Sequence, residues 1–375
     1  MQTRIFFLIG FLLLTVNTFS QDQNFHIYLC FGQSNMEGQG KIEAQDRIVD
    51  SRFQVMEAVN CSNLGRTMGS WYTAVPPLTR CNTGLSPADY FGRTLVDSLP
   101  SNIKVGIVNV SVAGCDIKLY DKYNYQSYVE TAPSWMKGYI NEYGGNPYGR
   151  LVDIARLAQQ DGVIKGILLH QGETNTGDNT WPSKVKGVYD NLLIDLELEP
   201  DSVPLLAGEV VHADQGGICA SMNQIIGKLP QTISNSYVIS SSGCTDTTDN
   251  LHFNSAGYRE LGKRYAVKML SILADTLAVG VSSTEAIFSG YILDQNYPNP
   301  FNPATTISFN IPAQSFVSLK VFDAFGREVS VLLSEQLPAG TYTRQWNAAG
   351  FSSGVYFYRL QAGSFMETRK LTLLR

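Results

Sequence analysis

The residues whose side chains and spacing could support catalysis lie in short polar segments, and most of these segments follow an apolar run. Ser34 follows the apolar run His26 to Phe31 and a glycine, Gly32, whose freedom permits a sharp turn. If that run is a buried strand, Ser34 lies at its carboxyl end, where ligands bind in α/β sheets. An exposed serine there suits nucleophilic catalysis, although an isolated turn serine would have no such role.

A serine nucleophile needs a base, and the chain offers four histidines, His26, His170, His212 and His252. His252 follows Asp249 by three residues, just before a long predicted helix. The carboxylate can then accept a hydrogen bond from one ring nitrogen while the other faces a substrate. The alternative is a solvated histidine beside a carboxylate at a helix start. His26 lies within the first predicted strand, away from its end, and His212 ends a later one, where it could line a cleft.

Two further polar, glycine-containing segments follow apolar runs, Ala113 to Asp116 and Gln171 to Asn175. Their amide, carboxylate and backbone groups are suited to hydrogen bonding at strand ends. Glu173 in the second segment is alternatively a carboxylate at the rim of the fold. A metal site formed by His170, Glu173 and His212 is a further alternative, but its spacing matches no zinc pattern such as HExxH.

Strand and helix patterns alternate from residue 22 to about 275. The predicted strands are rich in Val, Ile and Leu without strict alternation, as expected when both faces are buried, and they span 26–31, 105–113, 163–170, 205–211 and 236–240. The predicted helices span 86–99, 149–160, 185–198, 221–229 and 255–277. This alternation predicts an α/β fold with a parallel sheet and helices on both faces. Residues 40–85 lack this alternation of strand and helix patterns and are predicted to be a long insertion that shapes the substrate-binding side of the domain.

The chain of 375 residues is long enough for two domains, and its ends differ from its middle. Residues 1–20 contain Arg4 and the apolar run Ile5 to Val16, which is the form of a secretory signal peptide; a membrane anchor is the alternative. Residues 278–293 are predicted to be a linker. The remainder has short alternating strands and regular turns, which indicate a small antiparallel β-sandwich.

Charge and cysteine content narrow the class of protein further. The formal net charge is −5, without a basic cluster, so a nucleic-acid partner is not expected. No later stretch has the apolar length of a transmembrane helix. In an exported protein some cysteines form disulfides, and we favour Cys61 with Cys81 and Cys219 with Cys244. Cys30, inside the first predicted strand, is expected to be a buried free thiol.

The order of the four polar segments and the residues in them resemble the SGNH hydrolases. Within this superfamily they resemble the carbohydrate esterases that include acetyl xylan esterases and sialate O-acetylesterases. Gly32 to Asn35 (GQSN) resembles the nucleophile motif, and Ala113 to Cys115 the second block, with alanine in place of its first glycine. His170 to Glu173 resembles the third block, and Asp249 with His252 the last. The similarity covers roughly residues 24–275. It implies a three-layer, flavodoxin-like α/β domain over residues 22–277.

This resemblance implies a serine esterase that removes O-acetyl groups from carbohydrate without a metal or organic cofactor. Ser34 would be the nucleophile, His252 the base and Asp249 the residue that orients it. The oxyanion would be bound by the backbone N–H groups of Ser34 and Gly114 and by one side-chain amide. At the position of the superfamily asparagine this chain has Thr174, so the first choice for that amide is Gln171 and the alternative is Asn175. Gln33 and Glu173 are supporting residues.

The C-terminal residues 294–375 resemble the sorting domain of the type IX secretion system. The resemblance rests on Asn296 to Pro303 (NYPNPFNP), on the run Val317 to Gly326 and on Gly354 to Tyr356. It implies export across an outer membrane, with the secretion machinery as partner, to a secreted or surface-attached state. A carbohydrate-binding module on a similar sandwich is the alternative.

Two other functions are compatible with this sequence. One is a non-catalytic glycan-binding surface protein that keeps the scaffold, which a missing nucleophile, base or acid would favour; none is missing. The other is an esterase for a lipid or phosphodiester. Trp71, Trp135 and Trp181 lie in predicted loops, where they could stack on sugar rings, but we expect them to pack in the core.

Overall fold

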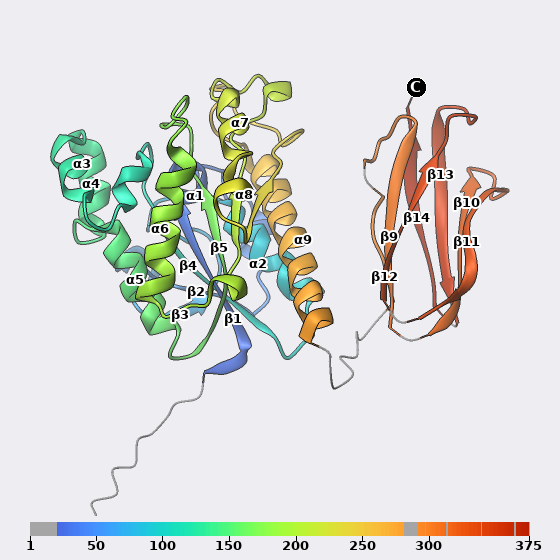
Figure 1. Ribbon diagram of the computed structural model, residues 1–375, viewed down its shortest axis with the longest axis horizontal. Helices are drawn as coiled ribbons and strands as arrows, with labels where there is room; N and C mark the ends of the chain where they lie inside the picture. The colour runs from blue at the N-terminus through green and yellow to red at the C-terminus, as the bar shows by residue number, and fades with distance from the viewer. Residues whose placement is uncertain are drawn as a thin grey trace, which may run out of the picture. The chain divides into compact units, whose positions relative to one another are not determined.

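The computed structural model describes residues 21–280, 291–296, 298–312, 314–338, 340–363 and 365–374. The predicted signal peptide and residues 281–290 of the predicted linker lie outside this range. The chain divides into two compact units, residues 1–275 and 276–375. Each is described by itself below (Figure 1).

The N-terminal unit is built on a seven-stranded sheet with the order β3-β2-β4-β1-β5-β6-β7. Its strands are β1 (Asp22–Gly32), β2 (Phe53–Met56), β3 (Trp71–Thr73), β4 (Lys104–Ser111), β5 (Gly162–His170), β6 (Leu205–Gly208) and β7 (Ser236–Ile239). The strands pair in parallel except for β3, which pairs with β2 in the antiparallel direction. The predicted α/β class and all five predicted strands are confirmed, and the sheet is mostly rather than entirely parallel.

Helices cover both faces of this sheet and make three layers (Figure 1). They are α1 (Ser34–Glu37), α2 (Pro87–Ser98), α3 (Tyr125–Thr131), α4 (Ser134–Glu142), α5 (Pro147–Ala158), α6 (Trp181–Asp195), α7 (Asn223–Ile226), α8 (Leu229–Thr232) and α9 (Ser255–Gly280). Alternate residues of β1 enter two separate cores. Leu29 packs in the core that contains residues of α5 and α6, whereas Tyr28 packs in the core that contains residues of α2 and α9.

Two local predictions were wrong. Residues 40–85 supply β2 and β3 to the sheet and are therefore not simply an inserted loop. These strands have four and three residues, too few to show a strand pattern in the sequence. The helix predicted over 221–229 is divided into a 3₁₀ turn, α7 and α8, with Gly227 between the two helices and Pro230 in the first turn of α8. Proline cannot donate the backbone hydrogen bond that a continuous helix would need there.

The disulfide predictions had mixed outcomes. Cys61 and Cys81 form a disulfide, as predicted. Cys219 and Cys244 do not, because they pack against different sides of the sheet: Cys219 lies against the α5 and α6 core, and Cys244 lies within the α2 and α9 core. Cys30 is a buried free thiol, as expected.

The C-terminal unit consists of two antiparallel sheets around one core, as predicted. The strands are β8 (Ile292–Leu293), β9 (Ala304–Ile311), β10 (Ser315–Asp323), β11 (Glu328–Leu337), β12 (Gly340–Asn347), β13 (Gly354–Ala362) and β14 (Phe365–Leu373). One sheet has the order β11-β10-β13-β14 and the other β12-β9-β8. Asn296, the first residue of the NYPNPFNP motif, is held at the core, where its N–H donates to the hydroxyl of the buried Tyr358 at 2.8 Å.

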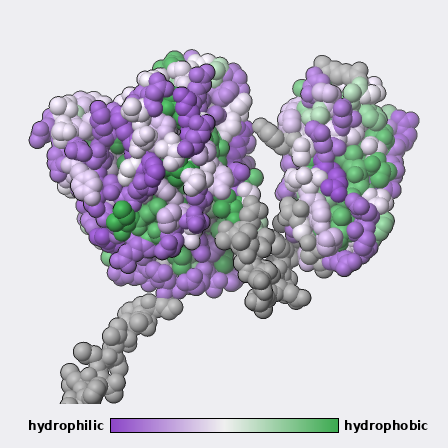
Figure 2. Space-filling view, in the orientation of Figure 1, coloured by the Kyte–Doolittle hydropathy of each residue, from purple (hydrophilic) through white to green (hydrophobic). Residues whose placement is uncertain are grey.

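The visible face of the N-terminal unit is mostly hydrophilic, with hydrophobic residues in small separate areas (Figure 2). Within the described ranges, no helix is both long and apolar enough to span a bilayer.

Candidate active site

Ser34 lies where the central strand β1 ends and the short helix α1 begins. Gly32 has φ +152°, and a Cβ at this position would lie 2.1 Å from the His170 carbonyl oxygen. Only glycine permits this approach of the ends of β1 and β5. The Gln33 N–H then donates to the same carbonyl at 3.0 Å, which fixes the turn that presents Ser34. The Ser34 side chain is nearly buried, with 6% of the residue exposed.

The structure brings Ser34, His252 and Asp249 together across more than two hundred residues of sequence. His252 Nε2 lies 2.9 Å from Ser34 Oγ, and His252 Nδ1 lies 2.7 Å from Asp249 Oδ2. The second Asp249 oxygen accepts hydrogen bonds from Thr247 Oγ1 at 2.6 Å and from the N–H groups of Leu251 and His252, each at 2.9 Å. Burial opposes the charge of Asp249, but these hydrogen bonds hold its pKa well below the ordinary value. Asp249 is therefore an ionised acceptor that keeps the proton of the imidazole on Nδ1.

Asn35 fixes the loop that carries His252. Its Nδ2 donates to the Leu251 carbonyl at 3.1 Å, and its Oδ1 accepts from the Phe253 N–H at 3.3 Å, so it binds the residues on both sides of His252. The Tyr258 hydroxyl of α9 also donates to Asn35 Oδ1, at 2.6 Å. The segment after β1 therefore positions both the hydroxyl and the imidazole. Tyr258 has no signal in the sequence that would have identified it.

The turns after β4 and β5 are joined by hydrogen bonds beside Ser34. Gly114 has φ +69°, a conformation that favours glycine. Its carbonyl accepts from Thr174 Oγ1 at 3.0 Å, and the Ile117 N–H donates to Asn175 Oδ1 at 3.0 Å. Within the described chain, the N–H groups of Ser34 and Gly114 donate no hydrogen bond, so both are available to a ligand.

The side-chain amides of Gln171 and Asn175 differ in whether their N–H groups are available to a ligand. Gln171 Nε2 donates to Gln33 Oε1 and the Cys115 carbonyl, each at 3.1 Å, and to Asn175 Oδ1 at 2.6 Å. Gln171 Oε1 accepts from the indole N–H of the buried Trp181. Asn175 Oδ1 accepts from a backbone N–H, which fixes the orientation of its amide. Its Nδ2 has no hydrogen-bond partner among the described residues, although Asn175 is only 4% exposed.

Gln33 and Glu173, which the sequence motif suggested as supporting residues, both form hydrogen bonds between the strand-end segments. Gln33 Oε1 accepts from the N–H groups of Gly172 and Thr174, each at 3.4 Å, in addition to Gln171. Glu173 Oε1 accepts from Asn35 Nδ2 at 2.5 Å. These contacts join the segment after β1 to the turn after β5.

The remaining histidines lie outside this arrangement. His170 is fully buried, its Nε2 lies 3.0 Å from the Glu209 carbonyl, and burial lowers its pKa, so it is neutral. His212 pairs with Asp214, with Nδ1 3.1 Å from Oδ1. His26 lies near the middle of β1, eight residues before Ser34. The part of the chain that the structure describes contains no group of three His, Cys, Asp or Glu placed to hold a metal ion.

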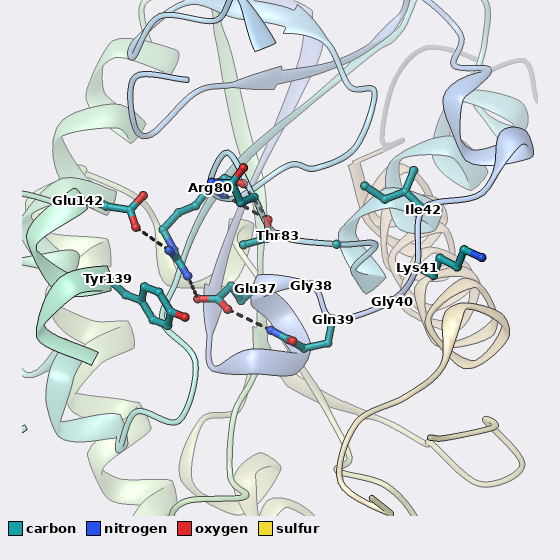
Figure 3. A pocket seen from close by; sticks show the side chains of 12 residues that line it. Glu37, Gly38, Gln39, Gly40, Lys41, Ile42, Arg80, Thr83, Tyr139 and Glu142 are labelled. Carbon is teal, nitrogen blue, oxygen red and sulfur yellow. Dashed lines mark hydrogen bonds and ion pairs between the residues drawn. The ribbon is translucent and has the colours of Figure 1, made fainter. Parts of the chain in front are cut away.

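An open pocket of about 650 Å³ begins at the last residue of α1, one helical turn beyond Ser34. Figure 3 shows Arg80 between Glu37 and Glu142, with Tyr139 beside its guanidinium. The lining is mostly polar or glycine and consists of residues 37–42, 80, 82–84, 139 and 142. Sequence reasoning did not identify this pocket, because its lining comes from segments far apart in the chain.

Comparisons with known proteins relate both units to described families. Residues 24–271 match the model described as carbohydrate esterase, sialic acid-specific acetylesterase, and residues 295–373 match the secretion system C-terminal sorting domain. A solved protein from Arabidopsis thaliana is 21% identical with a TM-score of 0.52, covering 67% of this chain and 99% of that chain, and shows the same fold. NanS is 16% identical with a TM-score of 0.49, covering 68% and 99%. A family 3 carbohydrate esterase from Clostridium thermocellum is 13% identical with a TM-score of 0.32, covering 68% and 99%.

Proposed function

Because the chain belongs to the sialic acid-specific acetylesterase family of carbohydrate esterases, we propose that it removes O-acetyl groups from carbohydrate by a Ser-His-Asp mechanism. The observation that carries the proposal is the continuous contact from Asp249 through His252 to Ser34 Oγ. This is the geometry in which a serine hydroxyl can lose its proton to a base as it attacks.

The reaction would proceed in two stages. Ser34 Oγ attacks the acetyl carbonyl carbon while its proton moves to His252 Nε2, and the same nitrogen then protonates the departing sugar oxygen. Water next attacks the acetyl ester on Ser34 while His252 takes its proton, and His252 then returns a proton to Ser34 Oγ as the ester bond breaks and acetate leaves. Asp249 keeps the other ring nitrogen protonated and stabilises the imidazolium that forms in each stage.

The negative charge on the carbonyl oxygen would be stabilised by three donors. The free N–H groups of Ser34 and Gly114 supply two of them. The hydrogen bonds of the side chains support Asn175 rather than Gln171 as the third, since three protein acceptors already surround the two N–H donors of the Gln171 amide. One donor of this kind typically contributes roughly 3 kcal/mol to catalysis.

The burial of the nucleophile supports a small acyl group. With Ser34 only 6% exposed, an acetyl group can approach its hydroxyl more easily than a long lipid chain. The C-terminal sorting domain indicates export through the type IX secretion system. We propose that the substrate is an extracellular acetylated carbohydrate and that residues 1–20 are a signal peptide for the first export step.

The proposal is tested by replacing Ser34 with alanine. Acetate release would be measured from acetylated xylan, O-acetylated sialic acid and a lipid ester, with 4-nitrophenyl acetate as the general substrate. We expect the wild-type protein to act on an acetylated carbohydrate and S34A to lose that activity while its circular dichroism spectrum is unchanged. Undiminished turnover by S34A would contradict the mechanism, and preference for the lipid ester would contradict the substrate class.

A further inference from the structure

One face of helix α4 connects the candidate oxyanion turn to the open pocket. Trp135, Tyr139 and Glu142 are spaced at i, i+4 and i+7, so they lie on the same face of the helix. Met136 and Ile140 are buried in the core. The Trp135 and Tyr139 rings contact each other edge to face, with centroids 5.9 Å apart. The helix therefore presents a row of two aromatic rings and a carboxylate.

Trp135 lies directly beside Gly114. A Cβ at Gly114 would come within 2.8 Å of the indole ring, so the ring is in contact with the turn that carries a proposed oxyanion donor. Trp135 is nevertheless 52% exposed, which corrects the expectation that it packs in the core. Trp181 is fully buried, as expected, and Trp71 is half-buried with its indole N–H donating to Asp161 at 2.9 Å. Trp135 thus combines a position at the reaction centre with a free aromatic surface.

Arg80 is held rigidly at the other end of this row. Its guanidinium stacks on Tyr139 at 3.9 Å from the ring centroid, and its two terminal nitrogens bind Glu37 at 2.6 Å and Glu142 at 2.7 Å. Glu37 Oε1 also accepts from the Ala113 N–H at 3.0 Å, which links the pocket to the turn at Gly114. Since two carboxylates neutralise Arg80, it is not available to bind an anionic ligand. In Figure 3 the Lys41 ammonium points away from Glu37 and Arg80.

The floor of the pocket is preformed by two chain segments that lie against each other. The Gly84 N–H donates to the Gly38 carbonyl at 2.7 Å, and Gly40 and Leu85 exchange two backbone hydrogen bonds, at 3.1 and 2.7 Å. The disulfide at Cys81 anchors the second segment just before the residues that line the pocket. A polar, open and rigid surface of this kind is suited to sugar hydroxyl groups, which need directed hydrogen bonds.

We propose that this surface is a glycan subsite: Trp135 stacks on the sugar that carries the acetyl group, and the pocket binds the hydroxyl groups of a neighbouring uncharged sugar ring. The inference rests on the proposed function and extends it to an acetylated oligosaccharide or polysaccharide of neutral sugars. The indole of Trp135 supplies apolar contact to the sugar ring. The pocket supplies hydrogen bonds to the sugar hydroxyl groups, and its guanidinium, that of Arg80, is already paired with carboxylates.

The test compares steady-state kinetics on acetylated xylo-oligosaccharide, acetylated xylose, O-acetylated sialic acid and 4-nitrophenyl acetate. For W135A we expect KM for the oligosaccharide to rise about tenfold with little change in kcat, as when binding shared by ground and transition states is lost. Activity on 4-nitrophenyl acetate should be unchanged, and W135F should recover most of the loss. Tyr123, an aromatic residue 70% exposed elsewhere on the same unit, supplies the control variant Y123A, which should behave as wild type.

A second variant, N82A, removes a side-chain amide from the pocket lining without touching Gly114. We expect it to raise KM for the oligosaccharide and to leave KM for acetylated xylose unchanged. If W135A lost activity equally on all substrates, Trp135 would only stabilise the Gly114 turn, and the inference would be overturned. A wild-type preference for O-acetylated sialic acid over the neutral oligosaccharide would also overturn it. Absence of wild-type activity on every acetate ester would instead contradict the proposed function.

Discussion

Among the residues that the structure describes, the N-terminal unit has two histidine–aspartate pairs, and one of them contacts the proposed nucleophile Ser34. His252 and Asp249 are 2.7 Å apart, and His212 and Asp214 are 3.1 Å apart. Both histidines are partly exposed, with side-chain exposures of 23% and 34%, and the pKa of each aspartate is lowered. Only His252 has a serine hydroxyl at its second ring nitrogen.

The difference lies in what holds each pair in place. Asn35 binds the backbone on both sides of His252, and that asparagine is the neighbour of Ser34 in the chain. Asp214 is instead bound by Ser242 Oγ at 2.6 Å, and within the described residues the pair forms no hydrogen bond or ion pair with the segment after β1. The two pairs therefore share a carboxylate beside an imidazole but differ in the residues that surround them. The proposed nucleophile and base are linked by one buried polar residue, Asn35.

The largest difference between the two pairs should appear when each histidine is replaced by alanine. We expect H252A to reduce kcat roughly 10⁴-fold or more, because the serine loses its base. H212A should stay within a few-fold of wild type. The rates would be measured with 4-nitrophenyl acetate. Similar losses in both variants would contradict the assignment of His252 as the base.

The aspartates should show the same contrast with a smaller effect. Replacing Asp249 by asparagine keeps the shape but removes the charge that stabilises the imidazolium, so we expect kcat to fall by roughly 10³- to 10⁴-fold. D214N is the matched variant and should keep nearly full activity. The comparison fails if D249N, shown to be folded by its thermal unfolding curve, retains wild-type kcat.

The proposed oxyanion donor, Asn175, can be distinguished from neighbouring amides by a further substitution. We expect N175A to lower kcat by roughly 10²- to 10³-fold with little change in KM, since the hydrogen bond forms mainly in the transition state. Asn179, exposed on the same loop and bound only to Lys228 at 3.5 Å, is the control as N179A. A change in KM alone for N175A would assign it to substrate binding instead.

The smallest effect should come from the hydrogen bond that orients Asp249. Thr247 Oγ1 donates to this carboxylate at 2.6 Å. Replacement by valine keeps the shape of the side chain, and we expect only a few-fold decrease in kcat, because two backbone N–H groups still hold the same oxygen. Loss comparable to that of D249N would mean that the loop itself had moved, which a shift in the melting temperature would reveal.

Much of the fold could be predicted because its central strands are buried on both faces. The runs at 26–31 and 163–170 are mostly apolar, and both form strands of the mostly parallel sheet. The short strands β2 and β3 could not be predicted, because their sequences show no hydrophobic strand pattern. They are strands because they pair with neighbouring strands. The proposed bridge between Cys219 and Cys244 was wrong for a related reason: proximity in sequence did not place them on the same face of the sheet.

The candidate site could also be predicted only in part from the sequence. Ser34, Asp249 and His252 could be named because their types and spacing carry the chemistry. The sequence favoured Gln171 over Asn175 as the amide donor, whereas the structure leads us to propose Asn175, because the carbonyl and indole groups around Gln171 already occupy its amide. The exposure of Trp135 beside Gly114 likewise depends on the docking of α4, which the sequence did not predict even as a helix.

The most direct test of the central claim is to identify the residue that becomes covalently modified. Full-length protein would be treated with a fluorophosphonate ester, which reacts with an activated serine, and the modified peptide would be sequenced by mass spectrometry. We predict a single adduct on Ser34 in the wild type and in H212A, formed in step with the loss of esterase activity, and a greatly slowed reaction in H252A. Modification of a different residue, or loss of activity without any adduct on Ser34, would contradict the account.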